Sequence, residues 1–268
     1  MFYAVDFASD DKDALQARLN QICDYENDLE TKVLHRARMN LFFLMMQDLI
    51  RRGVVTEFGS ALDIGCNTGV YSQMLSDFGF DRVLGVDIVP DMIERANRTF
   101  GRHEGEKVVE FRVADAEKLE REQKFDLILC TEVIEHTGRP ELVVGNIKAM
   151  LSPRGVAIVT LPNAWSLPYQ AANLAYRIKR PPKNQEFEDH LQYPFPRSLQ
   201  LMNGGGLRLV HTDGANLLLE THLLRKLYGT KLFAPLNRLQ FRLGRLWPFK
   251  YFAQFFFMVL TRKERPRP

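Results

Sequence analysis

Leu62-Asp63-Ile64-Gly65-Cys66-Asn67-Thr68-Gly69 joins a short apolar run to a helical pattern. In α/β proteins a glycine-containing turn between the first strand and the first helix is where a nucleotide-like ligand binds. Gly65 and Gly69 carry no Cβ, so the backbone of this turn can approach a ligand closely. The G-x-x-x-G spacing lacks the third glycine of the G-x-G-x-x-G turn and has no Walker lysine. It therefore argues against NAD and against a P-loop nucleotide.

Strands and helices alternate on both sides of this turn, which predicts a doubly wound, mostly parallel sheet. Short apolar runs predict strands at Ala61–Ile64, Val83–Ile88, Val109–Val113, Phe125–Cys130, Val156–Leu161, Leu207–Thr212 and Phe255–Arg262. Helical patterns at Val70–Phe78, Pro90–Phe100 and Pro140–Leu151 separate five of them. The fold class is thus α/β, with a seven-stranded sheet covered on both faces.

Helical segments flank this region. Apolar positions at three- and four-residue spacing predict helix over about 11–52. We expect one domain over 1–268: a helical cover (1–57), a cofactor-binding core (58–163) and an acceptor-side region (164–268). Within the last region a basic, amphipathic helical insert at 215–250 precedes the final strand.

Composition and charge narrow the class of protein. The three cysteines are far apart and form no CxxC pair, which indicates a reducing compartment and a cytoplasmic location. The acidic start, MFYAVDFASDDKD, does not have the pattern of a signal peptide. The longest apolar runs, Leu41–Met46 and Phe255–Leu260, fall far short of the ~20 residues of a membrane span. We therefore expect a soluble protein, or one resting on the inner face of a membrane.

Two acids end predicted strands beyond the turn. Asp87 closes the second strand, where a carboxylate can accept both hydroxyls of a ribose. Asp115 follows the third strand and can accept from an adenine amino group, while the backbone N–H of Ala116 meets a ring nitrogen. Acids at these two strand ends predict an adenosine-containing ligand.

Five segments in order resemble the motifs of class I S-adenosylmethionine-dependent methyltransferases: LDIGCNTG, GVDI, ADAEKL, FDLILCTEVIEH and LSPRGVAIVTLPN. They look most like the group that includes the ubiquinone-pathway O-methyltransferases, closely over about 58–163 and weakly in the flanks. The resemblance implies a Rossmann-like sheet whose last strand is antiparallel. It also implies S-adenosylmethionine as cofactor and S-adenosylhomocysteine as product.

The resemblance carries over to individual positions. Asp63 and Gly65 would lie near the methionine part, Asp87 at the ribose and Asp115 with Ala116 at the adenine, while Thr131 and Glu132 would border the sulfonium. The full set that we expect at the cofactor is Asp63, Gly65, Cys66, Asn67, Gly69, Asp87, Ile88, Asp115, Ala116, Thr131 and Glu132.

Catalytic candidates follow the fourth strand. His136 is the expected general base, because a neutral imidazole can take the acceptor's proton near neutral pH. Glu135 or Glu132 could orient it; the alternative is that Glu135 and His136 cap the next helix. His190 is a second candidate that would touch the acceptor, unless it is a surface histidine.

The same side chains allow a metal hypothesis. Glu132, Glu135, His136 and His190 resemble the metal-binding set of plant small-RNA 2′-O-methyltransferases. Oxygen and imidazole ligands suit Mg²⁺, Mn²⁺ or Zn²⁺. Metal-assisted 2′-O-methylation of RNA is therefore a second reading of the function.

The carboxyl-terminal part is basic, with eleven Lys/Arg and one acid over 221–268. Leu236, Leu239, Leu243 and Leu246 share one helical face, Arg238, Arg242 and Arg245 lie opposite, and Trp247 follows. This pattern is typical of a helix in a membrane interface and predicts a peripheral contact through 223–247. The alternative is that the leucines cover the acceptor pocket or the edge of the sheet and that the arginines are solvated.

These features favour O-methylation of a small-molecule or lipid-linked acceptor. A nucleic-acid partner is not expected, because no aromatic stacking platform accompanies the basic residues. A third reading is a non-catalytic, Rossmann-like partner protein at a membrane surface.

Overall fold

The computed structural model describes residues 29–104, 107–171, 174, 193–217 and 230–264. The chain divides into two compact units, one formed by Met1–Met45, Pro162–Glu188 and Asp213–Phe256, the other by Met46–Leu161, Asp189–Thr212 and Phe257–Pro268. The second unit contains nearly all of the predicted cofactor-binding core. The expectation of a single domain with three regions stays a prediction.

One sheet contains all the strands of the described residues. They are β1 (Ser60–Ile64), β2 (Arg82–Asp87), β3 (Arg102–Glu104), β4 (Lys107–Val113), β5 (Phe125–Thr131), β6 (Leu151–Pro162), β7 (Leu207–Ala215) and β8 (Phe255–Arg262). Their order is β3-β4-β2-β1-β5-β6-β8-β7. The seven predicted strands, the doubly wound class and the antiparallel last strand are confirmed. The short β3 is an addition, paired antiparallel with the edge of β4.

The centre of the sheet is parallel and buried on both faces. β1 pairs with β2 and β5, β2 pairs with β4, and β5 pairs with β6, all in parallel. Leu127 to Cys130 of β5 and Ala157 to Val159 of β6 are fully buried, as their unbroken apolar runs predict. Because the strands are parallel, the carboxyl ends of β1, β2, β4, β5 and β6 meet at one edge.

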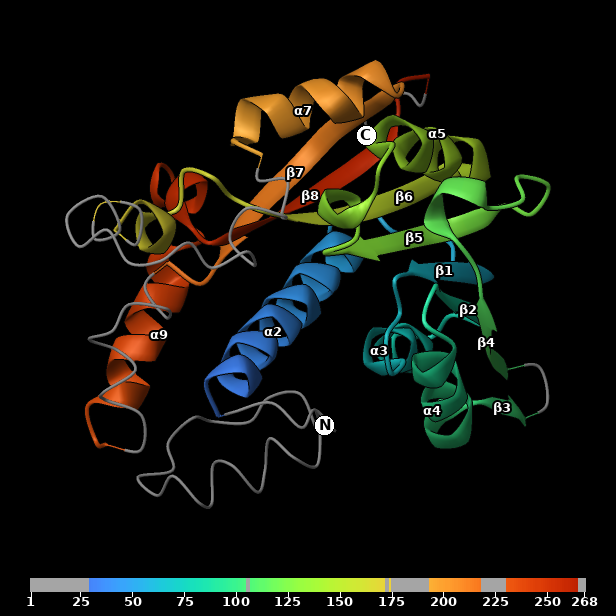
Figure 1. Cartoon of the computed structure of the whole chain (residues 1–268), viewed down its shortest axis with the longest axis horizontal. Coiled ribbons are helices and arrows are strands. Elements are labelled where there is room, and N and C mark those ends of the chain that lie inside the picture. The colour runs from blue at the N-terminus through green and yellow to red at the C-terminus, as the bar shows by residue number, and fades with distance from the viewer. Residues whose placement is uncertain (1–28, 105–106, 172–173, 175–192, 218–229, 265–268) are drawn as a thin grey trace. The chain divides into compact units, whose positions relative to one another are not determined.

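Helices cover both faces of the sheet in the second unit. They are α3 (Val70–Asp77), α4 (Pro90–Phe100), α5 (Pro140–Met150) and α7 (Phe195–Gly204), with 3₁₀ turns η1 (Ala116–Lys118) and η2 (Ile134–His136). Figure 1 shows α3 and α4 on one side of the sheet and α5 and α7 on the other. α4 and α5 each begin with proline, whose fixed φ suits the first helical turn.

The other unit contains most of α2 (Leu29–Arg51), all of α9 (Phe233–Leu243) and the 3₁₀ turn η4 (Phe249–Phe252). Within it, Arg38 lies over the ring of Phe255, 4.5 Å from the centroid. Asn163 donates to the carbonyls of Tyr251 and Ala253, which ties the end of β6 to the segment before β8. Among the described helices, none has the length and apolar character needed to cross a membrane.

Candidate functional site

The turn after β1 has the close-approach backbone that its glycines predict. Gly65 and Gly69 adopt positive φ of 73° and 87°. A Cβ at Gly65 would overlap the side chain of Val133, and one at Gly69 would lie 2.6 Å from the ring of Phe111. The backbone N–H groups of Gly65 and Cys66 both donate to the Val86 carbonyl, at 2.8 and 3.0 Å. The turn is thereby fixed against the end of β2.

Asp87 lies beside this turn. Its Oδ2 accepts from the backbone N of Asn67 at 2.9 Å, and its Oδ1 accepts from the backbone N of Val89 at 3.0 Å. Asn67 itself has a positive φ of 48°, so the turn bends toward the carboxylate. Each carboxylate oxygen has a second lone pair, and the side chain is half-buried. Asp87 can therefore still accept hydrogen bonds from a diol.

Asp63 is the acid beneath the turn, and it is fully buried. Ser72 Oγ donates to its Oδ2 at 2.6 Å, while Oδ1 has no hydrogen-bond partner. Burial raises the pKa of Asp63 to about 7; the Ser72 hydrogen bond opposes this rise and the charge of Asp87 adds to it. A buried, half-satisfied carboxyl is suited to a cationic ligand or an ordered water nearby.

Cys66 is a structural side chain of the turn. It is 5% exposed, and burial raises the pKa of its thiol well above the ordinary range. A thiol that stays protonated is a poor nucleophile. Cys66 therefore packs within the turn, and its contact with the cofactor stays a prediction.

The ends of β2 and β4 expose apolar side chains where the adenine is expected. Ile88, Val89 and Val113 are 65%, 42% and 53% exposed. The Ala114 backbone N donates to the Asp87 carbonyl at 2.9 Å, which holds the two strand ends together. Exposed aliphatic surface next to acids is what an aromatic base with an amino group requires.

Asp115 begins η1 and is already hydrogen-bonded within the chain. Its Oδ1 accepts from the Glu117 backbone N at 2.9 Å, and its Oδ2 lies 3.0 Å from Lys118 Nζ. The Glu117 N–H, and then the Lys118 ammonium, lower the pKa of Asp115. The carboxylate is therefore ionised and fixed, with lone pairs left for an amino group.

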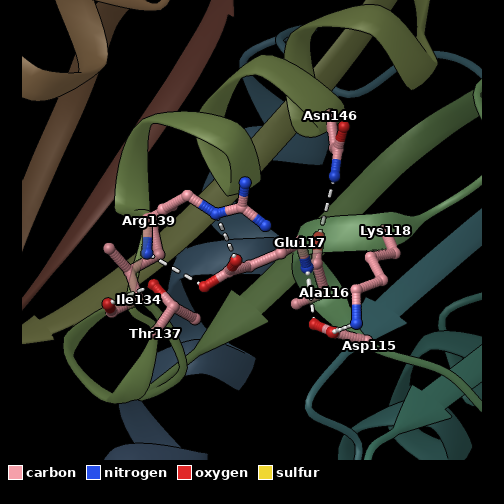
Figure 2. A network of polar contacts seen from close by, with 8 residues as sticks. All are labelled: Asp115, Ala116, Glu117, Lys118, Ile134, Thr137, Arg139 and Asn146. Atoms are coloured by element: carbon pink, nitrogen blue, oxygen red, sulfur yellow. Dashed lines mark hydrogen bonds and ion pairs between the residues drawn. The ribbon is translucent and has the colours of Figure 1, made fainter.

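Figure 2 shows that the loop carrying Asp115 and Ala116 is bound to the segment after η2. Glu117 accepts from the backbone N and the Nε of Arg139, and Asn146 Nδ2 donates to the Ala116 carbonyl at 2.8 Å. Arg121 Nε donates in turn to Asn146 Oδ1 at 2.9 Å. No local sequence pattern identifies these residues, because the hydrogen-bonded partners lie 22 to 30 positions apart.

The loop after β5 lies at the same edge of the sheet as the turn after β1. Glu132 has a positive φ of 54°, and its backbone N donates to Thr160 Oγ1 at 3.0 Å. Thr160 Oγ1 donates to Glu132 Oε1 at 2.8 Å. Thr160 pairs with Thr131 across β5 and β6. Its position at the end of a predicted strand was the one signal that could have identified it.

The two adjacent catalytic candidates have different environments. Glu135 is 2% exposed, whereas His136 is exposed at the end of η2. The His136 backbone N donates to the Val133 carbonyl, which forms the 3₁₀ turn. His190 lies outside the described residues, so its place relative to His136 stays a prediction.

The metal hypothesis gains no support from the part of the chain that the structure describes. There, no group of three or more His, Cys, Asp and Glu side chains is placed to hold a metal ion. Glu132, Glu135 and His136 therefore do not form such a group by themselves. His190 would be the fourth member of the predicted set.

Known proteins match this chain in sequence. A family model described as "Methyltransferase domain" matches residues 36–212. A protein named ubiquinone biosynthesis O-methyltransferase, from Rickettsia akari, is 31% identical over 102 residues, which cover 38% of this chain and 39% of that one. One of the same name from Coxiella burnetii is 29% identical over 157 residues, covering 57% and 65%. The matches thus span less than two thirds of these relatives' lengths.

A solved structure also has the same fold. The magnesium protoporphyrin IX methyltransferase of Synechocystis PCC 6803, solved with bound SAH, superimposes with a TM-score of 0.62 at 14% sequence identity. The superposition covers 93% of this chain and 94% of that one. At this identity the likeness concerns the fold.

Proposed function

The chain belongs to the family of methyltransferase domains, and on that premise we propose that it transfers a methyl group from S-adenosylmethionine to an oxygen of a small-molecule or lipid-linked acceptor. The observation that carries this proposal is the position of Asp87. Its carboxylate is held beside the Gly65–Gly69 turn by the backbone N–H groups of Asn67 and Val89. That is the arrangement needed to bind a ribose against a close-approach backbone.

Different residues at the sheet edge would bind different parts of the cofactor. Asp87 would bind the ribose hydroxyls, and Ile88 and Val113 would contact the faces of the adenine. Asp115 would accept from its amino group. Asp63, with an unpartnered buried oxygen, would lie under the cationic methionine end.

Methyl transfer to an oxygen requires that the acceptor is positioned near the methyl group and that its proton is removed. When bound, the cofactor would supply an electrophilic methyl group on a sulfonium: an acceptor oxygen would bond to the methyl carbon in line as the carbon–sulfur bond breaks, which leaves S-adenosylhomocysteine. His136 would take the acceptor's proton, because it stands exposed on η2 at the same sheet edge. Glu135, buried in the same turn, or Glu132 would orient His136.

The acceptor class rests on the relatives and on the carboxyl-terminal region. Two matched relatives are named for O-methylation in ubiquinone biosynthesis, which favours a phenolic or enolic oxygen on a hydrophobic molecule. The exposed apolar residues of α9 and η4 favour the same acceptor class. A peripheral contact through 223–247 with the inner face of a membrane would bring the enzyme to such a molecule; of that stretch, 223–229 lies outside the described residues.

Calorimetry with S-adenosylhomocysteine tests the cofactor assignment. We expect Asp87→Ala to weaken binding by about 10- to 100-fold, since it removes hydrogen bonds to a charged acceptor. Asp126→Ala is the matched control, because Asp126 accepts from the Ser60 backbone N at the opposite end of β1. Absence of binding to the unmodified protein would instead favour a non-catalytic partner protein.

Turnover tests the catalytic assignment. Methyl transfer to extracted lipids and to small phenols, followed with a labelled methyl group, would identify the acceptor class. His136→Gln should lower kcat with little change in the affinity for S-adenosylhomocysteine. If the variant lost affinity and kept its turnover per bound cofactor, His136 would not be the base.

A further inference from the structure

Helix α9 has two exposed leucines and two buried amide side chains. Asn237 and Gln240 are 4% and 2% exposed, whereas Leu236 and Leu239 are 39% and 53% exposed. A helix on a soluble domain normally has the reverse orientation, with the apolar stripe facing the core. The leucines of α9 are therefore available to something other than the protein interior.

Hydrogen bonds explain why the polar side faces inward. Gln240 Oε1 accepts from the Leu217 backbone N at 2.9 Å, and Gln240 Nε2 donates to Asn237 Oδ1 at 2.9 Å. A helix turned to bury its leucines would leave the buried Leu217 N–H without this acceptor. The outward orientation of the leucines is thus specified by the chain itself.

The exposed apolar side chains continue beyond the helix. We call the α9 surface the set Leu232, Leu236, Leu239, Leu246, Trp247 and Phe249, each between 39% and 77% exposed. Trp247 is the most exposed large apolar side chain among the described residues. Exposed leucines followed closely by an exposed indole ring are typical of segments at the water–lipid boundary.

The charged side chains of the segment that carries the α9 surface are all basic. Lys231, just before the helix, and Arg242, on the helix, are exposed. Residues 230–263 contain seven Lys/Arg and no Asp or Glu. Arg245 is neutralised by Asp213, at 2.8 Å, within the protein. The exposed positive charge of Lys231 and Arg242 is complementary to an anionic partner.

We propose that the α9 surface docks on an anionic lipid bilayer. Leucine and tryptophan side chains would enter the acyl boundary while the exposed basic side chains contact headgroup phosphates. A second copy of the chain fits less well, because a symmetric contact would bring the basic side chains of both copies together, and residues 230–263 contain no acid to pair with them. The role of this surface in presenting a lipid-linked acceptor rests on the proposed function.

Vesicle flotation of the full chain tests the proposal. We expect the protein to float with vesicles of phosphatidylglycerol and phosphatidylcholine, and about tenfold less with phosphatidylcholine alone. Leu239→Ser combined with Trp247→Ser should reduce binding to the anionic vesicles about tenfold, and so should Lys231→Glu combined with Arg242→Glu. The matched control is Arg82→Glu with Arg98→Glu, two exposed arginines of the other unit, which should leave flotation unchanged.

Three outcomes would overturn the proposal: no flotation of the unmodified protein, equal flotation of the α9 variants, or equal loss in the control. A dimer in light scattering that the α9 variants convert to monomer would assign the surface to a second copy. Calorimetry with S-adenosylhomocysteine on the same proteins keeps this test separate from the proposed function. If the protein binds S-adenosylhomocysteine but does not float with vesicles, only the lipid-docking proposal fails. If it floats but does not bind S-adenosylhomocysteine, only the cofactor assignment fails.

Discussion

Glu117 accepts two hydrogen bonds from Arg139, one from the backbone N at 2.9 Å and one from the guanidinium Nε at 3.0 Å (Figure 2). Glu117 follows the Asp115-Ala116 pair that we expect at the adenine. Arg139 lies three residues beyond His136, at the start of α5. One carboxylate therefore connects the proposed adenine loop to the segment that carries the proposed base.

Removing the charge of Glu117 should affect both ends of this connection. Glu117→Gln can keep one acceptor for Arg139 but loses the paired, charge-assisted contact. We expect a several-fold rise in the Kd of S-adenosylhomocysteine, and a further fall in kcat at saturating cofactor because η2 is less well positioned. Calorimetry and steady-state kinetics on the same samples separate the two effects.

Glu110→Gln is the matched control for that variant. Glu110 also pairs with an arginine, Arg112 at 2.8 Å, but on β4 away from η2. It should leave both Kd and kcat unchanged. If the two variants behave alike, the effect of Glu117 is a general loss of charge and the connection has no functional role.

Burial of Asp63 predicts a pH dependence of stability. Its pKa is raised to about 7 in the folded protein, whereas an unfolded chain ionises the same carboxyl near 3.8. The unfolded chain ionises first, so the free energy of unfolding falls as the pH rises from about 4 to about 7. This fall is complete above the pKa of the folded state. Three units correspond to a loss on the order of 4 kcal/mol in the free energy of unfolding.

Asp63→Asn should remove this loss. Urea unfolding gives the free energy of unfolding of the variant and of the unmodified protein at pH 5 and at pH 8. The difference, variant minus unmodified protein, should be larger at pH 8 than at pH 5. Asp126→Asn serves as the control. It should change the free energy of unfolding by a similar amount at both pH values, because Asp126 is only half-buried. A pH-independent difference for Asp63→Asn would mean that the carboxyl is already ionised when folded.

The sequence predicts the centre of this fold well because its strands are apolar throughout. Phe125 to Cys130 and Val156 to Leu161 have no polar face to be confused with a helix stripe, and both are strands in the structure. β6 begins earlier than predicted, at Leu151, and a register shift between Phe125 and Leu127 accommodates the extra residues. Such an irregularity depends on the neighbouring strand, so one segment alone cannot indicate it.

The site was predictable where a local pattern specifies it. The glycine turn and Asp87 follow from strand ends, and the structure brings them together. The contacts of Glu117 with Arg139 and of Gln240 with Leu217 join residues more than 20 positions apart. For α9 the periodicity gives the apolar stripe but not its direction, because a buried hydrogen bond determines which side faces the protein.

Gly69 provides the most direct test of the turn, together with Gly145 as its internal reference. Gly69 has φ of 87°, and an added Cβ would lie 2.6 Å from the Phe111 ring. Gly69→Ala should therefore lower the free energy of unfolding by more than about 1 kcal/mol and weaken binding of S-adenosylhomocysteine. Gly145 lies inside α5 with open space around its Cα, so Gly145→Ala should raise stability by about 0.5–1 kcal/mol and leave binding unchanged. Chemical unfolding and calorimetry on both variants measure these effects, and equal behaviour of the two alanines would show that the turn does not need its left-handed backbone.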